Sequence, residues 1–193
     1  MVENLKLQNK TISSSDSNLP SGKTVTVPAS STANWCTDTT QACFERLLTL
    51  DATDTSIPDQ SSAQSNYGVY YNWYTATATY GSYEKTSGNV DYSICPKMWH
   101  LPTDGNSSST DFQILYSYYD SRLDITSSNG PSIVLSGYRI GSSTRNQGSH
   151  SMYWSRTAPN VNYAYGLHLD ASNAYAVSSI TRTYGASIRC LAN

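Results

Sequence analysis

Residues 162–179 read NYAYGLHLDASNAYAVSS, and this stretch decides how the C-terminal part of the chain is predicted to fold. Its apolar residues alternate with Gly, His, Asp, Asn, Ser and Tyr, which is the pattern of a β-strand with one buried face. The opposite face would then be free to vary without loss of stability. We expect Tyr165, Leu167 and Leu169 on the core face, and Ala164, Gly166, His168 and Asp170 on the other.

Further short strands are predicted on both sides of this segment. Residues 23–28, KTVTVP, alternate in the same way, whereas residues 51–66 are rich in turn residues and indicate a loop. After the Asn129-Gly130 turn the chain reads as strands separated by turns. The strand-like stretches there are SIVLSGYRI (132–140), MYWSRT (152–157), YAYGLHLD (163–170), AYAVSS (174–179) and ASIRCL (186–191).

Residues 110–119, TDFQILYSYY, give the clearest helix signal in the chain. Thr110 and Gln113 fit a capping box at its start. A shorter helix is predicted for FERLLTL, residues 44–50. One or two helices followed by a run of antiparallel strands make the predicted fold class α+β. The apolar stripe of the main helix is expected to contain Phe112, Leu115, Tyr116 and Tyr119, which indicates packing against a core.

Composition narrows the classes of protein to consider. The 193 residues carry a net charge of −2 and only 13% charged residues, which argues against a nucleic-acid binder. Apolar runs are too short for a membrane-spanning helix. Tyrosine is abundant, with 16 residues against two phenylalanines. Tyr, Ser, Gly and Asn are typical of binding surfaces that combine large contact area with adaptable hydrogen bonding, although they also suit an ordinary exposed sheet.

The four cysteines, Cys36, Cys43, Cys95 and Cys190, favour disulfides and an oxidising compartment. Their spacing does not match a metal site, because no C-x-x-C occurs and no histidine accompanies them at ligand spacing. Three pairings are possible. We favour Cys36–Cys43, which closes a short loop, with Cys95–Cys190 tying the middle of the chain to its end; free buried thiols are the alternative.

Seven motifs follow one another along the chain: YYNWYTATA (70–78), ICPKMWHLPT (94–103), FQILYSYY (112–119), SGYRIGSS (136–143), QGSHSMYWSRTA (147–158), YAYGLHL (163–169) and YGASIRC (184–190). Their order resembles the Fibrobacter succinogenes major paralogous domain, a family that looks like a branch of the C-type-lectin-like fold. The resemblance covers about residues 67–190, and VENLKL (2–7) is similar to the start of that domain. Met98 stands where the family's CPKGW motif has Gly, and Arg156 where YWSST has its second Ser. The resemblance implies the Cys95–Cys190 disulfide and a C-type-lectin-like core over residues 67–193, with residues 1–66 forming an N-terminal part with exposed loops.

The end of the chain, residues 153–193, resembles the variable region of proteins diversified by retroelements. Randomised adenines in Asn codons can yield Tyr, Ser, Asp, His, Gly and several other residues, but not Lys, Glu, Gln, Met or Trp. None of those five types occurs from Thr157 to Asn193, although they make up 21 of the 193 residues. A Ser- and Tyr-rich lectin-like domain without diversification is the alternative interpretation.

In the proteins that this region resembles, its exposed positions form the ligand surface. We therefore expect a secreted or surface-displayed binding module whose partner is a protein or a cell-surface ligand such as a glycan. A structural or adhesive cell-envelope domain is the second hypothesis. Arg145 and His150 are expected to flank the binding surface. The candidate ligand-binding residues are Asn160, Tyr163, Gly166, His168, Asp170, Tyr175, Ser179, Thr181, Thr183 and Tyr184.

Catalysis and metal binding find little support in the sequence. No serine-hydrolase, zinc-protease or phosphate-loop motif occurs, and disulfides would use every thiol, so we do not expect an enzyme. No cofactor is expected. Calcium is the one metal considered, because LPTDGNSSSTD offers Asp104, Asn106 and Asp111, yet a calcium ion prefers six to eight oxygen ligands. No signal peptide is visible, because Met1 stands directly before polar sequence, and an extracellular or cell-surface location is expected with the export signal or anchor missing from this chain.

Overall fold

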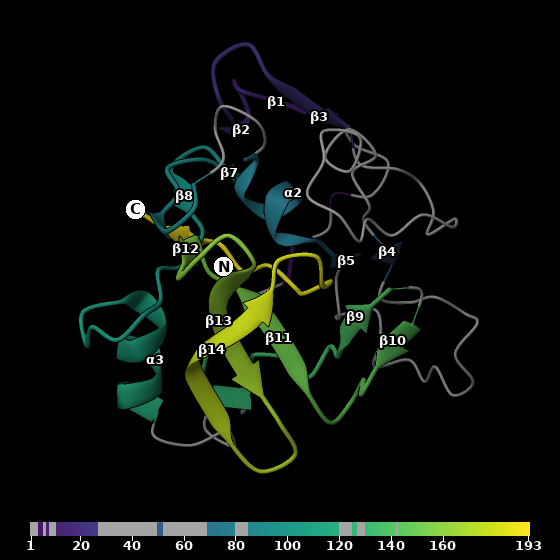
Figure 1. Cartoon of the computed structure of the whole chain (residues 1–193), viewed down its shortest axis with the longest axis vertical. Coiled ribbons are helices and arrows are strands. Elements are labelled where there is room, and N and C mark those ends of the chain that lie inside the picture. The colour runs from purple at the N-terminus through teal and green to yellow at the C-terminus, as the bar shows by residue number, and fades with distance from the viewer. Residues whose placement is uncertain are drawn as a thin grey trace.

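The structure is a computed structural model, and the part of the chain that it describes combines many short strands with the helices α2 and α3 (Figure 1). This confirms the predicted α+β class. The residues that it describes are 4–5, 7, 11–26, 50–51, 69–79, 85–119, 125–126, 130–141 and 143–193.

A three-stranded antiparallel sheet forms the centre of the C-terminal half. Its strands are β11 (Ser151–Trp154), β13 (Tyr163–Leu169) and β14 (Ala174–Thr181), with β13 in the middle. The prediction of strands from the alternation in this segment is therefore confirmed. In Figure 1 the loop between β13 and β14 lies at the bottom of the view, with α3 (Asp111–Tyr119) beside β14.

The other strands form short antiparallel pairs around this sheet. β3 confirms the strand predicted near Lys23, and β9 lies at the end of the stretch predicted from Ser132. The pairs are β1 (Thr11–Ser13) with β3 (Thr24–Thr26), β2 (Ser17–Asn18) with β7 (Ser93–Pro96), β4 (Leu50–Asp51) with β5 (Val69–Tyr70), β6 (Gly88–Asn89) with β12 (Thr157–Ala158), β8 (Trp99–His100) with β15 (Leu191–Ala192), and β9 (Tyr138–Ile140) with β10 (Ser143–Arg145).

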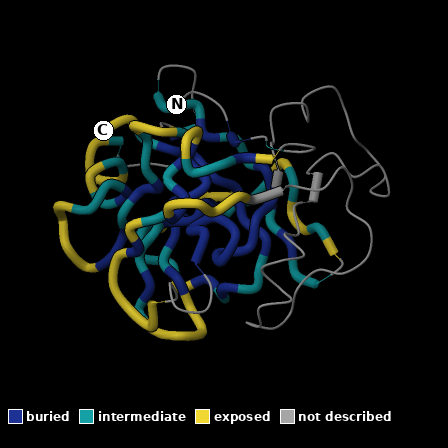
Figure 2. The backbone as a smooth tube through the Cα atoms, turned by 90° about the horizontal axis from the view of Figure 1, so that it is seen from above, coloured by how far each residue is buried: buried dark blue, intermediate teal, exposed yellow. Residues whose placement is uncertain are grey.

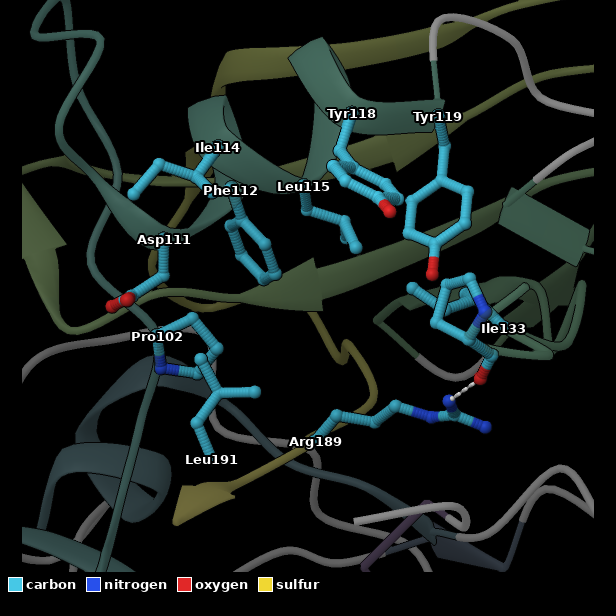
Figure 3. A pocket seen from close by; sticks show the side chains of 11 residues that line it. Pro102, Asp111, Phe112, Ile114, Leu115, Tyr118, Tyr119, Ile133, Arg189 and Leu191 are labelled. Atoms are coloured by element: carbon cyan, nitrogen blue, oxygen red, sulfur yellow. Dashed lines mark hydrogen bonds between the residues drawn. The ribbon is translucent and has the colours of Figure 1, made fainter. Parts of the chain in front are cut away.

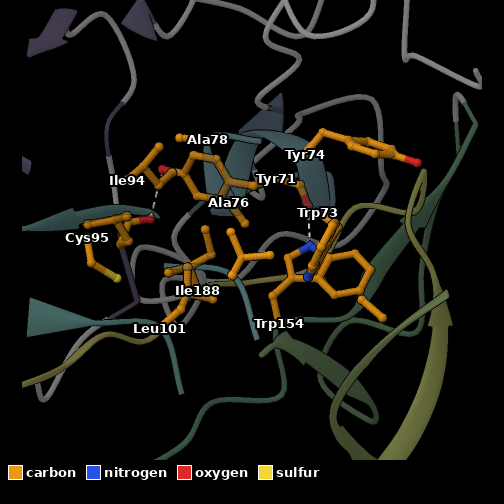
Figure 4. Packing of buried hydrophobic residues seen from close by; sticks show 14 of the residues in the cluster. Tyr71, Trp73, Tyr74, Ala76, Ala78, Ile94, Cys95, Leu101, Trp154 and Ile188 are labelled. Atoms are coloured by element: carbon orange, nitrogen blue, oxygen red, sulfur yellow. Dashed lines mark hydrogen bonds between the residues drawn. The ribbon is translucent and has the colours of Figure 1, made fainter. Parts of the chain in front are cut away.

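Two tryptophans organise the larger apolar cluster, which we call the tryptophan core (Figure 4). Trp73 starts the short helix α2 (Trp73–Thr77), and Trp154 ends β11; both are fully buried. Each indole N–H has a backbone acceptor, because Trp73 Nε1 donates to the Ser155 carbonyl at 2.9 Å and Trp154 Nε1 donates to the Tyr71 carbonyl at 2.6 Å. Around them pack Leu5, Tyr71, Ile94, Leu101, Ala164, Ile180, Ile188 and the Cys95–Cys190 pair.

The disulfide between Cys95 and Cys190 confirms that part of the cysteine prediction. The two Cα atoms are 5.8 Å apart, and the bridge closes a loop across 95 positions of sequence. In the chain-entropy model a loop of that length stabilises the fold by about 4.5 kcal/mol. Cys36–Cys43, the helix predicted at 44–50 and most of the 51–66 loop lie outside the described residues.

A second cluster, the leucine core, lies on the other side of the central sheet. Leu167 and Leu169 of β13 are fully buried there, as predicted, beside Tyr153 of β11. Ala164 on the opposite face of β13 is also fully buried, in the tryptophan core, which corrects the expectation that this face is exposed. β13 thus has an apolar core on each side, and Figure 2 shows buried backbone gathered in the middle of the molecule. The leucine core consists of Phe112, Ile125, Ile133, Tyr153, Leu167, Leu169 and Ala174.

The predicted main helix is confirmed as α3, but its first turn differs from the expected capping box. Thr110 Oγ1 donates to the Ser107 carbonyl, and the Gln113 amide donates to the Gly105 carbonyl. The helix start is held instead by Thr103, whose Oγ1 accepts from the Asp111 N–H at 3.1 Å while donating to the Asp111 carboxylate at 2.7 Å. Of the predicted apolar stripe, Phe112 is buried, Leu115 and Tyr119 pack partly against the leucine core, and Tyr116 is exposed.

Met98 has a backbone conformation that residues with side chains seldom adopt. It lies in the turn between β7 and β8 with φ of 66°, and its side chain is 71% exposed. Left-handed φ favours glycine, because a Cβ atom makes this conformation costly. The glycine of the CPKGW motif would therefore suit this turn better than methionine does.

Candidate functional site

The candidate residues from the sequence do not form a single surface, because the β13–β14 hairpin places them on both faces of the sheet. The pairs Tyr163↔Thr181 and Tyr165↔Ser179 lie on one face, and the pairs Ala164↔Ile180 and His168↔Tyr175 lie on the other. The first face leads into the leucine core and the second into the tryptophan core. Most of the candidate residues therefore fall into two separate groups.

Gly166 belongs to neither group, which corrects its assignment as a ligand-binding residue. It is buried, and a Cβ atom built on it would collide with the backbone carbonyl of Tyr153 and lie 2.7 Å from Ile180 Cδ1. The close approach of β11 to β13 requires a residue without a side chain here. Gly166 is a packing residue.

The first group lies at the turn end of the hairpin and contains three aromatic side chains that we call the aromatic row: His150, His168 and Tyr175. The His168 ring is 6.2 Å from the His150 ring and 5.8 Å from the Tyr175 ring, centroid to centroid, with interplanar angles of 28° and 32°. Tyr175 is 44% exposed, and His168 is half-buried. His150, which was expected to flank the binding surface, lies against His168.

A β-bulge in β14 puts Tyr175 on the same face as His168. Gly166 pairs with Ser178 and His168 with Tyr175, so Ala176 and Val177 together oppose the single residue Leu167. Without the extra residue, strand alternation would turn Tyr175 to the leucine-core face. Val177 has φ of 63°, a strained conformation for a β-branched residue.

Asp170 closes the hairpin beside the aromatic row. Its Oδ1 accepts hydrogen bonds from the backbone N–H groups of Ser172 and Asn173, both at 2.7 Å, which forms an Asx-type turn. These two bonds, with a further bond from the Tyr175 hydroxyl, lower the pKa of Asp170 to about 2. The same contact raises the pKa of Tyr175. Asp170 is therefore ionised at every physiological pH.

His168 is held in the neutral form at neutral pH. Burial lowers its pKa below the ordinary value, and the nearby His150 lowers it further, against a smaller opposing effect of Asp170. Its Nε2 atom is shielded from solvent and has no hydrogen-bond partner in the described part of the chain. Tyr116 of α3 also lies close enough to Tyr175 to affect the pKa of that hydroxyl.

The second group of candidates lies around the start of β13. Tyr163 is 41% exposed, Ser179 is exposed and Thr181 is half-buried. Asn160 is exposed and caps the loop before β13, because its Oδ1 accepts from the backbone N–H groups of Asn162 and Tyr163. Thr183 and Tyr184 are half-buried, Tyr184 packs partly against the tryptophan core, and Arg145 is exposed on β10, in a different sheet.

Arg182, which sequence reasoning missed, is a structural residue inside the segment that was expected to vary. Its guanidinium carbon lies 4.2 Å from the centre of the Trp73 ring, and its side chain is almost fully buried. Arg182 Nη2 donates to the carbonyls of Asn160 at 2.6 Å and Lys85 at 2.9 Å. Between residues 171 and 188 Arg182 is the one charged residue, and this was the signal that could have identified it.

The carboxylates considered for calcium have other partners. Asp104 is 1% exposed, and its oxygens accept from the backbone N–H groups of Gly105 and Val177. Asp111 accepts from both the N–H and the hydroxyl of Thr103 and lies 3.6 Å from His100 Nε2. Asn106 is exposed. Among the described residues no group of three His, Cys, Asp or Glu side chains could hold a metal ion.

A pocket of about 370 Å³ lies beneath α3, and none of the candidate ligand-binding residues lines it (Figure 3). Its walls are mostly apolar, with Phe112, Leu115 and Tyr119 on one side and Ile133 and Leu191 opposite. Arg189 lies at its edge and donates to the Pro131 carbonyl at 2.6 Å and the Ser132 carbonyl at 2.8 Å. The apolar face of α3 was expected to pack against a core, and no pattern in the sequence indicates a cavity there.

No family model, curated protein or solved structure matches this chain. Over the part that the structure describes, no helix is long and apolar enough to cross a membrane.

Proposed function

We propose that this chain is a ligand-binding module with a C-type-lectin-like scaffold, displayed outside the cell, that contacts its ligand through the turn end of the β13–β14 hairpin. The observation that carries the proposal is the aromatic row. His150, His168 and Tyr175 lie side by side where the tryptophan-core face of the sheet reaches solvent. Half-exposed rings of this kind offer large contact area at low entropic cost.

Two features support the scaffold and the location. The strained φ of Met98 occurs where the resembling family has glycine, as expected if the turn geometry is shared. The Cys95–Cys190 disulfide favours an oxidising compartment outside the cytoplasm.

We include diversification by a retroelement in the proposal. The burial of residues in the hairpin then predicts which positions vary. Changes should be confined to exposed positions such as Tyr163, Tyr175 and Ser179, because Gly166 and Arg182 are packed inside. The genomic neighbourhood tests this directly. We expect a reverse-transcriptase gene and a near-identical template repeat that differs from this gene at the exposed codons and matches it at the buried ones. Differences concentrated at Gly166 and Arg182, or no such repeat, would refute diversification.

Binding itself is tested with the triple variant Tyr163→Ser, His168→Ser and Tyr175→Ser. The immobilised domain is probed with arrays of cell-surface proteins and glycans, with and without a chelator. The variant should lose the ligands that the unmodified domain binds, while its melting temperature stays nearly unchanged. Equal binding by the two proteins would contradict the proposal and favour the structural or adhesive alternative. A sharp fall in melting temperature would show that these side chains belong to the core.

A further inference from the structure

The turn end of the hairpin carries a permanent negative charge. Asp170 is ionised, and both of its backbone hydrogen bonds go to Oδ1, so Oδ2 keeps acceptor capacity. No lysine or arginine among the described residues forms an ion pair with it. A carboxylate in this state attracts a cation from outside the chain.

Aromatic rings lie beside this charge. The Tyr175 hydroxyl is close enough to the Asp170 carboxylate for each group to shift the pKa of the other. The centroids of the Tyr175 and His168 rings are 5.8 Å apart and the ring planes are inclined by 32°, so the two rings are neighbours, and His168 is neutral at neutral pH. The face of a neutral aromatic ring is electrostatically negative and attracts ammonium and guanidinium groups.

Carboxylate and ring together distinguish one class of ligand group from others. An anion would be repelled by Asp170. A neutral sugar could stack on Tyr175 but would gain nothing from the charge. A guanidinium is planar, so it can lie flat on an aromatic ring while its N–H groups pair with a carboxylate. The chain uses the same stacking internally, where Arg182 covers Trp73 at 4.2 Å.

We propose that Tyr175, His168 and Asp170 form a subsite for an organic cation, above all the guanidinium of an arginine side chain. This inference rests on the proposed function, since it names the group that the same surface binds. The cation could belong to an exposed arginine of a protein ligand or to a small free molecule, and the chemistry of recognition is the same for both.

The test is an NMR titration of the ¹⁵N-labelled domain with the peptide acetyl-Gly-Arg-Gly-amide. We expect shifts concentrated at the backbone amides around Tyr175, His168 and Asp170. The matched peptide with citrulline has nearly the same shape without the charge, and it should bind about tenfold more weakly or not at all. Agmatine separates the two sources: clearly tighter binding of the peptide indicates a protein ligand, and similar binding indicates a small cation.

Asp170→Asn is the sharpest variant, because an asparagine side-chain oxygen can accept the same two turn hydrogen bonds while the charge is removed. Arginine-peptide affinity should fall about tenfold. Asp91→Asn is the control for net charge, since Asp91 is exposed and pairs with Lys85. Tyr175→Ser should abolish the peptide-induced shifts, whereas Tyr118→Ser removes an exposed tyrosine of α3 that belongs to neither group of candidates and should leave them unchanged.

Equal affinity for the arginine and citrulline peptides, or no shifts at tens of millimolar peptide, would overturn the inference. The proposed function would stand if a ligand found on the arrays required Tyr175 for binding but bound equally well to the Asp170→Asn variant. The proposed function would be refuted together with the inference only if the arrays also gave no ligand whose binding depends on the aromatic row.

Discussion

The buried carboxylate of Asp104 accepts the backbone N–H of Val177, at 3.0 Å to Oδ2 and 3.2 Å to Oδ1. This contact joins the loop after β8 to the bulge in β14, across 73 positions of sequence. It provides a hydrogen-bond acceptor for the N–H of Val177, whose left-handed φ is strained. Asp104 therefore helps to hold the bulge that places Tyr175 beside His168.

Asp104 should make stability depend on pH. Burial raises its pKa to about 6, against the lowering effect of its hydrogen bonds from Gly105 and Val177. The folded state then binds a proton more tightly than the unfolded state does, so the free energy of unfolding should fall as pH rises from about 4 to about 6, by up to about 3 kcal/mol. Urea unfolding at several pH values measures this.

Asp104→Asn is the matching variant, because it keeps an oxygen acceptor and cannot ionise. Its stability should be nearly flat over the same pH range. Asp104→Ala should lose about 1–3 kcal/mol at every pH, since the N–H groups of Gly105 and Val177 then lack their acceptor. A wild-type profile that rises with pH through this window would contradict the assignment.

Gly166 should not tolerate a side chain. Gly166→Ala brings a methyl group against the Tyr153 carbonyl and Ile180 Cδ1, so β11 and β13 have to separate. Overpacking of this kind costs about 1–3 kcal/mol. Thermal unfolding of Gly166→Ala should show that loss, and Ser179→Ala, at an exposed position of the same hairpin, should stay within about 0.5 kcal/mol of the unmodified chain.

Met98→Gly should stabilise the fold. The substitution removes the steric cost of the left-handed conformation, and the exposed methionine side chain has little packing to lose. We expect a gain of about 1 kcal/mol in the free energy of unfolding. Met98→Ala is the control, because alanine keeps the Cβ atom and should bring no such gain. A loss of stability with glycine would contradict the turn geometry.

Acid should weaken ligand binding at the aromatic row. His168 is neutral at neutral pH and gains a proton only below its ordinary pKa range, because burial and His150 oppose its charge. Protonation would put a positive charge in the row beside His150, Asp170, Tyr175 and Tyr116, and a bound cation would be repelled.

The pH dependence of arginine-peptide affinity measures this effect. Asp170 stays ionised down to a pH of about 2, so a loss of affinity between pH 7 and pH 5 is attributed to histidine. His168→Gln should bind the peptide without that loss. A pH dependence that persists in this variant would exclude His168 as its source.

The sequence predicted the positions of helices and strands better than it predicted which faces of them are buried. Alternation identified β13 and β14, and helical spacing identified α3, because each pattern reflects local geometry. Leu167 and Leu169 were placed correctly. Ala164 and Gly166 were wrongly expected to be exposed. Alternation indicates that the two faces of a strand differ, but it does not show whether both faces are buried. The face with Ala164 and Gly166 is covered by a second core, to which α2 and the N-terminal segment contribute.

The candidate site was predicted in part for a similar reason. His168, Asp170 and Tyr175 do lie together, but strict alternation would have turned Tyr175 to the opposite face. The bulge at Val177 depends on Asp104, a residue far away in sequence, and no local pattern contains that contact. The partner of Arg182 was hidden likewise, since Trp73 lies more than a hundred positions earlier.

The Cys95–Cys190 bridge has a consequence for proteolysis. The whole β13–β14 hairpin lies inside the covalent loop that it closes. One peptide bond cleaved anywhere between those cysteines would leave the two fragments joined through sulfur, with the hairpin still attached to the rest of the protein. A nicked copy would thus keep the surface that we propose as the binding site.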